Sequence, residues 1–478
     1  MKKVIILLLA MLSLNAIAQN TITWSSGMNI AANSYDNLHP RIVIDDSGNP
    51  MVIWGRMSDK SVFFSRWNGV GFTAPVKLNP IWMDVATADW MGPDIASKGD
   101  TVYVVMKRSP EASDTNHIYI TRSFNGGATF STPARIDFIA DSVSRFPTVT
   151  IDASGNPIVA FMKFDTSFGD ARWVVTKSFN YGTTFSTDTK ASGQSGGEVC
   201  DCCPGGITNS GNTVAMLYRT NISNIRDTWV GISSNNGNTF PNGYNIDQNN
   251  WMIMACPSTG PDGIIIGDTL YAVFMNEASG SARTYLSKST ISSSAVNSVN
   301  LLTGSIPGLA AQNYPRIDRF GNAAAIVWKQ SVSGNDHLPV LFTNDITNGF
   351  PATYDTVDLS NITNTDVALS NGNIFVVWQD DNSGTVKYRT GTFTPLNTSV
   401  NENEENHLSV YPVPAGTEIN IRPLSGEKFE LEIFNTLGEA IIRSKNNNTI
   451  DISQLSNGIY FLKVRENKYS YSRKFIKR

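Results

Sequence analysis

Short hydrophobic runs recur along the chain, and a Gly-Asn or Gly-Asp pair precedes each of them. Seven such pairs begin at Gly48, Gly99, Gly155, Gly211, Gly267, Gly321 and Gly372. The intervals between them are 51, 56, 56, 56, 54 and 51 residues. A glycine beside Asn or Asp is typical of a tight turn, because glycine tolerates a positive φ. Each pair therefore predicts a hairpin that leads into a buried strand, and the near-constant interval predicts a repeated structural unit.

The units also begin alike. A proline, or a residue in its place, stands six to eight residues before each glycine, at Pro40, Pro93, Pro147, Pro204, Pro261, Pro315 and Asp366. A third strand such as 118–121 follows the hairpin, and then a fourth such as 132–136. Four antiparallel strands in about 54 residues is the size of one β-propeller blade. The pattern predicts an all-β fold, with a seven-bladed or alternatively a six-bladed propeller over residues 19–398.

The two ends of the repeat array complement each other. The last repeat stops after residues 386–393 and lacks a fourth strand, whereas residues 22–30 form a spare strand before the first repeat. We expect the spare strand to pair beside 386–393 and to complete the seventh blade. This pairing closes the ring and removes exposed strand edges.

The first eighteen residues have the pattern of a signal peptide. Lys2 and Lys3 precede an apolar run over residues 4–14, and Ala16-Ile17-Ala18 matches a signal peptidase site. We expect the mature chain to begin at Gln19. No later stretch has the roughly 20 apolar residues that a spanning helix needs, so we expect an exported chain without a transmembrane segment.

Composition narrows the classes of function. The chain has 37 Lys and Arg against 41 Asp and Glu, a net charge of −4. This balance argues against a nucleic-acid partner. Neither H-E-x-x-H nor G-x-S-x-G occurs, so zinc peptidases and α/β-hydrolases have no support. We expect no cofactor, and His39 is expected as a packed or solvated residue and not a catalytic base.

Three loops between third and fourth strands share the motif S-x-N-x-G-x-T-F, at residues 123–130, 178–185 and 233–240. They resemble the Asp-box of sialidase-type (BNR-repeat) propellers, with Asn in place of the usual Asp and Phe in place of the usual Trp. We expect a structural role, because the Asn side chain can bond its own backbone and the glycine permits a positive φ. The resemblance places these loops on the face opposite the active site.

A second module follows the propeller. Residues 399–407 contain the acidic stretch NENEEN and predict a linker. Residues 408–478 alternate apolar and polar positions like the strands of a small sandwich. They resemble the C-terminal sorting domain of the type IX secretion system of Bacteroidetes, in the Tyr411-Pro-Val-Pro opening, the Asn457-Gly-Ile-Tyr strand and the basic end 474–478. The resemblance implies the secretion machinery as a partner and export across the outer membrane, with the propeller surface-attached or released.

Charged residues follow the prolines that start the units. In a propeller the first strands begin near the axis on one face, and the loops between second and third strands open on that face. We therefore predict a basic axial funnel that binds a carboxylate, sulfate or phosphate, because arginine offers a planar, bidentate fork. We expect Arg41, Arg219 and Arg316 to point toward the axis with Asp94 and Asp262 within reach. The candidate ligand-binding residues are Arg41, Asp94, Arg219, Arg226, Asp262 and Arg316.

The resemblance to sialidases implies a second use of this funnel. In that family three arginines hold a sugar carboxylate, a Tyr activated by a Glu attacks, and an Asp serves as the acid. The candidates here are Tyr285, Glu277 and Asp94, although none lies in a motif of that family and the usual Arg-Ile-Pro order is absent. Three functions stay open: binding of acidic glycans or glycoproteins, exo-α-sialidase-type hydrolysis, and a protein-interaction scaffold.

Four cysteines, Cys200, Cys202, Cys203 and Cys256, indicate disulfides in an exported chain. Cys203 precedes Pro204 and Cys256 precedes Pro257, so each leads into a first strand, of the fourth and fifth repeats. We predict that Cys256 is bonded to one of the other three and links blades four and five. The remaining two either pair locally, Cys200 with Cys202 or Cys203, or stay as thiols able to hold a soft metal.

Overall fold

The computed structural model describes residues 22–396 and 409–478, apart from short gaps at 32–34, 112–115, 139–141, 166, 168, 412, 423–428, 436–438 and 467–468. The signal peptide and the linker predicted above lie outside the described residues. The chain divides into two compact units, residues 1–396 and 397–478. Both units consist of strands, with two 3-10 turns, η1 (Gly193–Ser195) and η2 (Ile346–Asn348), in the first. The predicted all-β class is confirmed.

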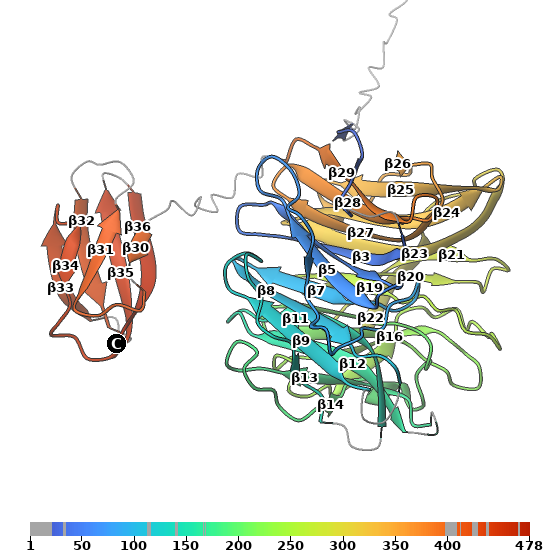
Figure 1. Cartoon of the computed structure of the whole chain (residues 1–478), viewed down its shortest axis with the longest axis horizontal. Helices are drawn as coiled ribbons and strands as arrows, with labels where there is room; N and C mark the ends of the chain where they lie inside the picture. Colours follow the sequence, from blue (N-terminus) through green and yellow to red (C-terminus); the bar gives the residue numbers. More distant parts are fainter. Residues whose placement is uncertain are drawn as a thin grey trace, which may run out of the picture. The chain divides into compact units, whose positions relative to one another are not determined.

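Seven antiparallel sheets make up the described part of the first unit (Figure 1). The first sheet contains β3 (Asn37–Ile44), β4 (Pro50–Arg56), β5 (Ser61–Arg66) and β6 (Val76–Lys77). The second contains β7 (Asp94–Lys98), β8 (Thr101–Lys107), β9 (Ile118–Ser123) and β10 (Ala134–Arg135). The third contains β11 (Ser142–Ile151), β12 (Pro157–Asp165), β13 (Arg172–Lys177) and β14 (Thr189–Lys190). The fourth contains β15 (Gly206–Ser210), β16 (Thr213–Arg219), β17 (Thr228–Ser233) and β18 (Asn242–Asn245). The fifth contains β19 (Asp262–Ile266), β20 (Thr269–Asn276), β21 (Arg283–Thr290) and β22 (Ala295–Leu301). The sixth contains β23 (Leu309–Phe320), β24 (Ala323–Val332), β25 (Asn335–Thr343) and β26 (Asp355–Asp358). The seventh contains β27 (Ile362–Ser370), β28 (Asn373–Asp380), β29 (Thr385–Thr392) and the N-terminal strands β1 (Thr23–Trp24) and β2 (Met28–Asn29).

The N-terminal strands close the ring. Thr23 pairs with Thr392 and Met28 pairs with Tyr388, so the spare strand lies beside β29 as predicted. The first strands contact one another in order around the unit, and the contact of β27 with β3 joins the last sheet to the first. The N-terminal strands thus pair with the last repeat and give the seventh sheet its fourth strand, which covers an otherwise exposed edge.

The hydrophobic runs after the glycines become the second strands, which are buried on both faces. Met51, Val52, Ile53 and Trp54 of β4 are all buried, for example. A strand covered on both sides reads as a continuous apolar run, whereas a strand with one wet face alternates. The cores lie between neighbouring sheets, as where Trp173 of β13 packs in one cluster with residues of β16.

The three Asp-box-like turns have the same internal hydrogen bonds. In the first, Ser123 Oγ accepts a hydrogen bond from the Gly127 N–H at 2.9 Å. Asn125 Oδ1 accepts from the Thr129 N–H, also at 2.9 Å. The turns that start at Ser178 and Ser233 repeat both bonds. Because the strands are antiparallel, these turns lie at the end of each sheet opposite the start of its first strand.

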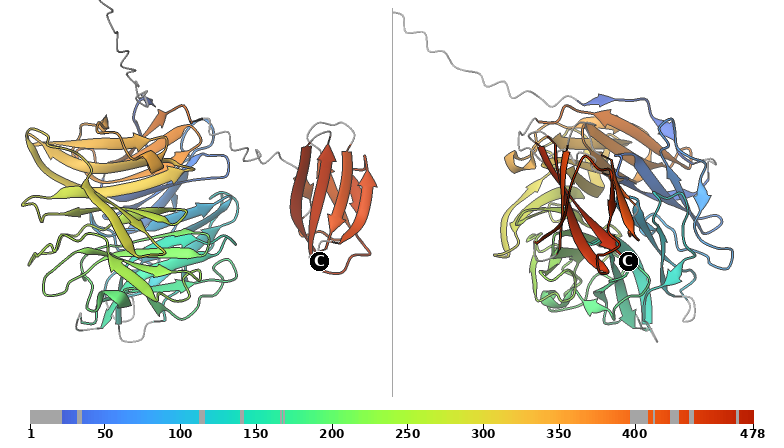
Figure 2. Two further views of the ribbon diagram at one scale, coloured as in Figure 1. Left: turned by 180° about the vertical axis from the view of Figure 1, so that it is seen from behind. Right: turned by 90° about the vertical axis from the view of Figure 1, so that its left-hand side faces the viewer.

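The second unit is a small two-sheet sandwich (Figure 2). One sheet contains β30 (Ser409–Tyr411), β31 (Glu418–Arg422) and β34 (Thr449–Asp451), and the other contains β33 (Ala440–Lys445), β32 (Phe429–Phe434), β35 (Gly458–Glu466) and β36 (Tyr469–Lys477). Ile419 and Ile450 of the first sheet pack with Leu431 and Leu462 of the second in one buried core.

Candidate functional site

The segments that start the first strands of all seven sheets surround one pocket, which we call the axial pocket. It has a volume of about 50 Å³. One lining residue from the start of each sheet, in chain order, is Arg41, Asp94, Thr148, Gly205, Gly260, Arg316 and Thr365. Arg41, Asp94 and Arg316 therefore meet there, as expected from the sequence.

Bulges aim side chains into the axial pocket. The pairing of β3, β11, β23 and β27 with the adjacent second strand shifts register near the start of each strand. In each of these four strands one shift contains a residue with a positive φ, namely His39, Phe146, Tyr314 and Asn364, with φ of 55°, 52°, 51° and 57°. All four line the axial pocket. Positive φ is uncommon outside glycine, and bulges of this kind occur next to functional sites, where they redirect a side chain.

Arg316 is paired with two carboxylates. Its Nε lies 3.0 Å from Asp366 Oδ1 and 3.4 Å from Asp262 Oδ2. Burial by itself lowers the pKa of Arg316, but Asp262, Asp366 and Asp94 outweigh it and raise the pKa above its ordinary value. Arg316 thus belongs to a compensated charge cluster, and its positive charge is largely used within the protein.

The carboxylates at the pocket also connect neighbouring blades. Asp94 Oδ2 accepts hydrogen bonds from Thr148 Oγ1 at 2.7 Å and from the Val149 N–H at 3.0 Å. Asp262 accepts from the backbone N–H of Ile317, and Asp366 accepts from that of Ile42, each at 3.0 Å. Each bond runs from one first strand to the first strand of the next sheet. These carboxylates therefore have a structural role whatever else they do.

Arg41 differs from Arg316 because no carboxylate within the described residues forms an ion pair with it. Arg41 is buried, with only 9% of its surface exposed to solvent. Its Nη1 donates to the Pro40 carbonyl and its Nη2 contacts His39 Nε2, both at 2.8 Å. Burial and Arg316 lower the pKa of Arg41 to about 10, although Asp366, Asp94 and Asp262 oppose them. Arg41 is a buried guanidinium with donors to spare and no direct anionic partner.

His39 supports the Arg41 guanidinium as a neutral acceptor. Burial lowers the pKa of His39 well below its ordinary value, and the charges of Arg41 and Arg316 lower it further. An uncharged imidazole can accept the hydrogen bond from Arg41 Nη2, whereas a protonated one cannot. His39 is therefore packed and uncharged, which agrees with the expectation from the sequence.

A segment between the first and second sheets forms one side of the pocket mouth. Asp89 Oδ1 accepts a hydrogen bond from Gln379 Nε2 at 3.0 Å, and the Asp89 carbonyl accepts from Asn364 Nδ2 at 2.6 Å. These bonds tie the segment to the seventh sheet and hold Trp90, which lines the pocket and is 45% exposed. Thr259 also lines the pocket, and its buried Oγ1 has no hydrogen-bond partner among the described residues.

The expectation that Arg219 and Arg226 share this pocket is wrong. Arg219 is fully buried and donates to the carbonyls of Arg226 and Met275, each at 2.7 Å. Arg226 donates to Cys200 Sγ at 2.8 Å. Backbone carbonyls bind the Arg219 guanidinium and a sulfur binds that of Arg226, and neither residue lines the pocket. Of the four predicted arginines only Arg41 and Arg316 line the pocket, where the charges of Asp94, Asp262 and Asp366 act on both.

Tyr285 and Glu277 also lie outside the axial pocket lining. Tyr285 is buried within its sheet, where its ring stacks on Phe274 with centroids 5.7 Å apart. The tyrosine that does line the pocket is Tyr314. Burial, Asp89 and Asp381 raise the pKa of Tyr314. The sequence reasoning did not identify Tyr314, Trp90, Asn364 or Asp366 as site residues.

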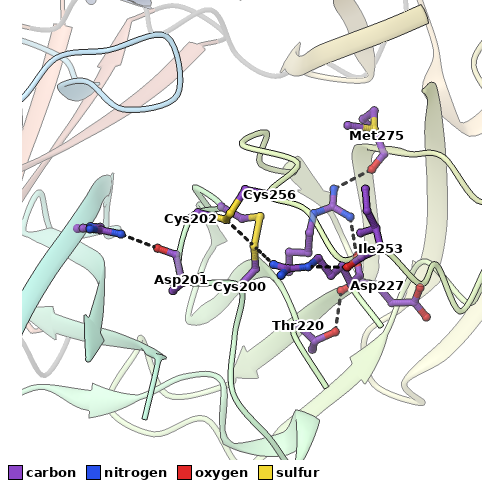
Figure 3. The surroundings of a disulfide bond; sticks show 12 residues. Cys200, Asp201, Cys202, Thr220, Asp227, Ile253, Cys256 and Met275 are labelled. Atoms are coloured by element: carbon purple, nitrogen blue, oxygen red, sulfur yellow. Dashed lines mark hydrogen bonds between the residues drawn. A yellow bond between two sulfur atoms is a disulfide. The ribbon is translucent and has the colours of Figure 1, made fainter. Parts of the chain in front are cut away.

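The cysteines form two disulfides beside the pocket (Figure 3). Cys202 is bonded to Cys256, which is 54 positions away in sequence, and their Cα atoms are 6.1 Å apart. Cys200 is bonded to Cys203, with Cα atoms 5.4 Å apart. The predicted link from Cys256 to the triplet is confirmed, and of the two alternatives left open for the remaining cysteines the structure has the local pair. No cysteine lines the axial pocket.

Comparison with known structures finds several remote similarities. A Hadza microbial sialidase is 12% identical, with a TM-score of 0.46 over 64% of this chain and 66% of that protein. An ulvan lyase bound to -[GlcA(1-4)Rha3S]- is 10% identical, with a TM-score of 0.48 over 75% and 94%. A Trypanosoma rangeli sialidase in complex with the inhibitor DANA is 9% identical, with a TM-score of 0.43 over 94% and 88%. No curated protein matches the chain.

The C-terminal unit has a family match. Residues 409–478 match the secretion system C-terminal sorting domain. No helix of the described residues is long and apolar enough to cross a membrane. The chain is therefore a β-propeller protein that carries a C-terminal sorting domain and is exported by type IX secretion.

Proposed function

We propose that the axial pocket binds the anionic group of an acidic glycan, a carboxylate or a sulfate. The observation that carries the proposal is Arg41, a buried guanidinium that forms no ion pair with a carboxylate of the described residues, in a pocket built by all seven sheets. A planar guanidinium holds such oxyanions with two parallel hydrogen bonds. A bound anion would also offset the cost of keeping this charge out of water.

The size of the pocket supports recognition of a single small group. Pockets that enclose whole small-molecule ligands have volumes of about 300–1,000 Å³, whereas the axial pocket has about 50 Å³. A carboxylate or sulfate would enter, and the sugar ring would stay at the mouth. There the exposed face of Trp90 offers an apolar surface on which the C–H face of a sugar ring can pack.

Several observations favour binding over hydrolysis. A raised pKa keeps the Tyr314 phenol protonated, the opposite of what a tyrosine nucleophile needs. Asp94 accepts hydrogen bonds from Thr148 and Val149, which occupies one of its oxygens in holding two blades together. Sialidase-type hydrolysis and a protein scaffold are the alternatives that the experiment must separate.

A glycan array with the mature chain tests the proposal, followed by calorimetric titration of the best acidic glycan. We expect Arg41→Ala to weaken acidic glycans at least about tenfold, because a charge-assisted bidentate contact is lost. Arg41→Lys keeps the charge but loses the fork, so we expect a smaller loss. Arg122→Ala is the matched control, since Arg122 bonds the Asp-box-like turn at Tyr181 on the opposite face.

The outcomes separate the three functions. Binding of acidic glycans that depends on Arg41 and does not depend on Arg122 supports the proposal. The proposal would be contradicted if Arg41→Ala weakened acidic and neutral glycans equally, or if Arg41→Ala and Arg122→Ala weakened acidic glycans equally. Release of dye from a fluorogenic sialoside by the wild-type chain would support the hydrolase alternative, and binding of a protein without any glycan would support the scaffold.

A further inference from the structure

The cysteine cluster, defined as Cys200, Cys202, Cys203 and Cys256, contains more sulfur than a link between two blades requires. The bond between Cys202 and Cys256 alone joins the segments that lead into the fourth and fifth sheets. Cys200 and Cys203 are three positions apart, so their bond closes a very short loop and removes little chain entropy. The local pair needs another explanation.

The sulfur atoms converge as the ligands of one ion would. The Sγ atoms of Cys200, Cys202 and Cys203 all lie within 4.8 Å of one another. Cys200 Sγ is 3.5 Å from Cys202 Sγ, although these two are not bonded to each other. Thiolates bind a metal such as zinc at about 2.3 Å, so ligands on opposite sides of one ion are up to about 4.6 Å apart. In the structure the two disulfides hold the sulfur atoms this close, so once those bonds are opened the thiols start near enough to one another to bind a single shared ion.

Two guanidiniums lie against the cluster. Arg226 Nη1 donates to Cys200 Sγ at 2.8 Å. Arg145 Nη1 donates to the carbonyl of Asp201 at 3.1 Å, while the rest of its guanidinium pairs with Glu111 at 2.6 Å. Figure 3 shows Asp201 to one side of Cys200 and Cys202, with its hydrogen bond directed away from the sulfur atoms. Neighbouring cations favour the thiolate over the thiol. The charge of Arg226, which contacts Cys200 Sγ, also offsets part of the negative charge that several thiolates bring to a monovalent ion.

Two methionines on the same segment indicate which ion. Met252 and Met254 stand four and two positions before Cys256 and are 69% and 87% exposed. No buried core in the described residues includes either side chain. Thioethers together with thiolates are the soft ligands that suit Cu(I), whereas zinc takes Cys, His and carboxylate ligands.

We propose that the cysteine cluster, once its two disulfides are reduced, binds one Cu(I) ion, with Met252 and Met254 assisting its capture. The burial of the cluster supports this order: Cys256 is exposed and Cys202 half-buried, while Cys200 and Cys203 are buried. A thiol reductant reaches Cys256 first. Four thiol molecules become two disulfides as the protein gains four thiols, and Cu(I) then displaces one proton from each thiol that it binds.

The test uses the mature full-length chain, reduced under argon, freed of reductant and titrated with Cu(I) against the chelator bicinchoninate. We expect one Cu(I) per reduced chain and none per oxidised chain. Cys202→Ser should lower the Cu(I) affinity at least about tenfold. Met254→Leu should lower it severalfold and leave Zn(II) binding unchanged. Met57→Leu, at another exposed methionine, is the matched control and should change nothing.

A melting curve keeps the result interpretable, because reduction removes a cross-link. A folded site raises the melting temperature of the reduced chain when Cu(I) is added, since a ligand of the folded state stabilises it. Absence of Cu(I) binding by the reduced chain would overturn the proposal. Undiminished binding by Cys202→Ser would do so as well, as would Cu(I) binding that leaves the melting temperature unchanged.

Discussion

The Cys202–Cys256 disulfide should be a major contributor to the stability of the propeller unit. Its partners are 54 positions apart, so it closes a loop of about 55 residues in the unfolded chain. In the chain-entropy treatment a loop of this length corresponds to about 4 kcal/mol at 25 °C. We therefore predict that the double variant Cys202→Ser/Cys256→Ser loses about 4 kcal/mol of unfolding free energy. Serine suits both positions because Cys256 is exposed and Cys202 half-buried.

The corresponding change in melting temperature is modest because the unit is large. The unfolding entropy is about 2.1 cal/mol/K per residue, which gives roughly 0.8 kcal/mol/K for the roughly 375 residues from 22 to 396. A loss of about 4 kcal/mol then lowers the melting temperature by about 5 °C. Differential scanning calorimetry of the oxidised wild type and of the double variant measures this shift.

The same measurement under reducing conditions is the control. Once a reductant has opened the disulfides, wild type and variant differ only by two exposed or half-buried side chains, and their melting temperatures should coincide. A difference below about 1 kcal/mol in the oxidised state would refute the loop-closure argument. A difference that persists after reduction would show that the serines, and not the lost cross-link, destabilise the variant.

Three further predictions concern the pocket and the ring. Below about pH 6.5 His39 takes up a proton in the unfolded chain but stays neutral in the folded chain, so the free energy of unfolding should fall as the pH falls. In His39→Gln the slope of unfolding free energy against pH should be shallower by up to about 1.4 kcal/mol per pH unit. Equal slopes in chemical denaturation of the two proteins would contradict the neutral state of His39. Asp366→Asn leaves Arg316 with one carboxylate fewer and weakens the hydrogen bond to the Ile42 N–H, so we expect urea titrations to show a loss of about 2–4 kcal/mol of unfolding free energy. The control Asp355→Asn, at the surface, should lose less than about 0.5 kcal/mol. Removal of residues 22–30 exposes the edge of β29, so light scattering should detect association of the truncated chain, and a monodisperse monomer would argue against closure by the N-terminal strands.

Features with a local cause were predictable from the sequence. The glycine pairs reflect turn geometry, which acts within one hairpin, and the apolar runs after them mark strands that neighbouring sheets cover on both faces. The S-x-N-x-G-x-T-F loops follow the same logic, because Ser123 and Asn125 bond backbone groups at most four residues away. The closing strand was predictable from the number of strands in each repeat, since the last repeat lacked a fourth strand and the N-terminus had a spare one.

Only the tertiary structure decided which charged side chains meet at the axis. A bulge of one residue changes the face on which every later side chain of a strand lies. The bulge in β27 thus places Asp366 beside Arg316, although the repeat pattern had aligned Asp366 with the prolines. Arg219 follows its repeat faithfully, yet the carbonyls of Arg226 and Met275 hold its side chain away from the axis. Such contacts form between segments far apart in sequence, so no periodicity along one strand contains them.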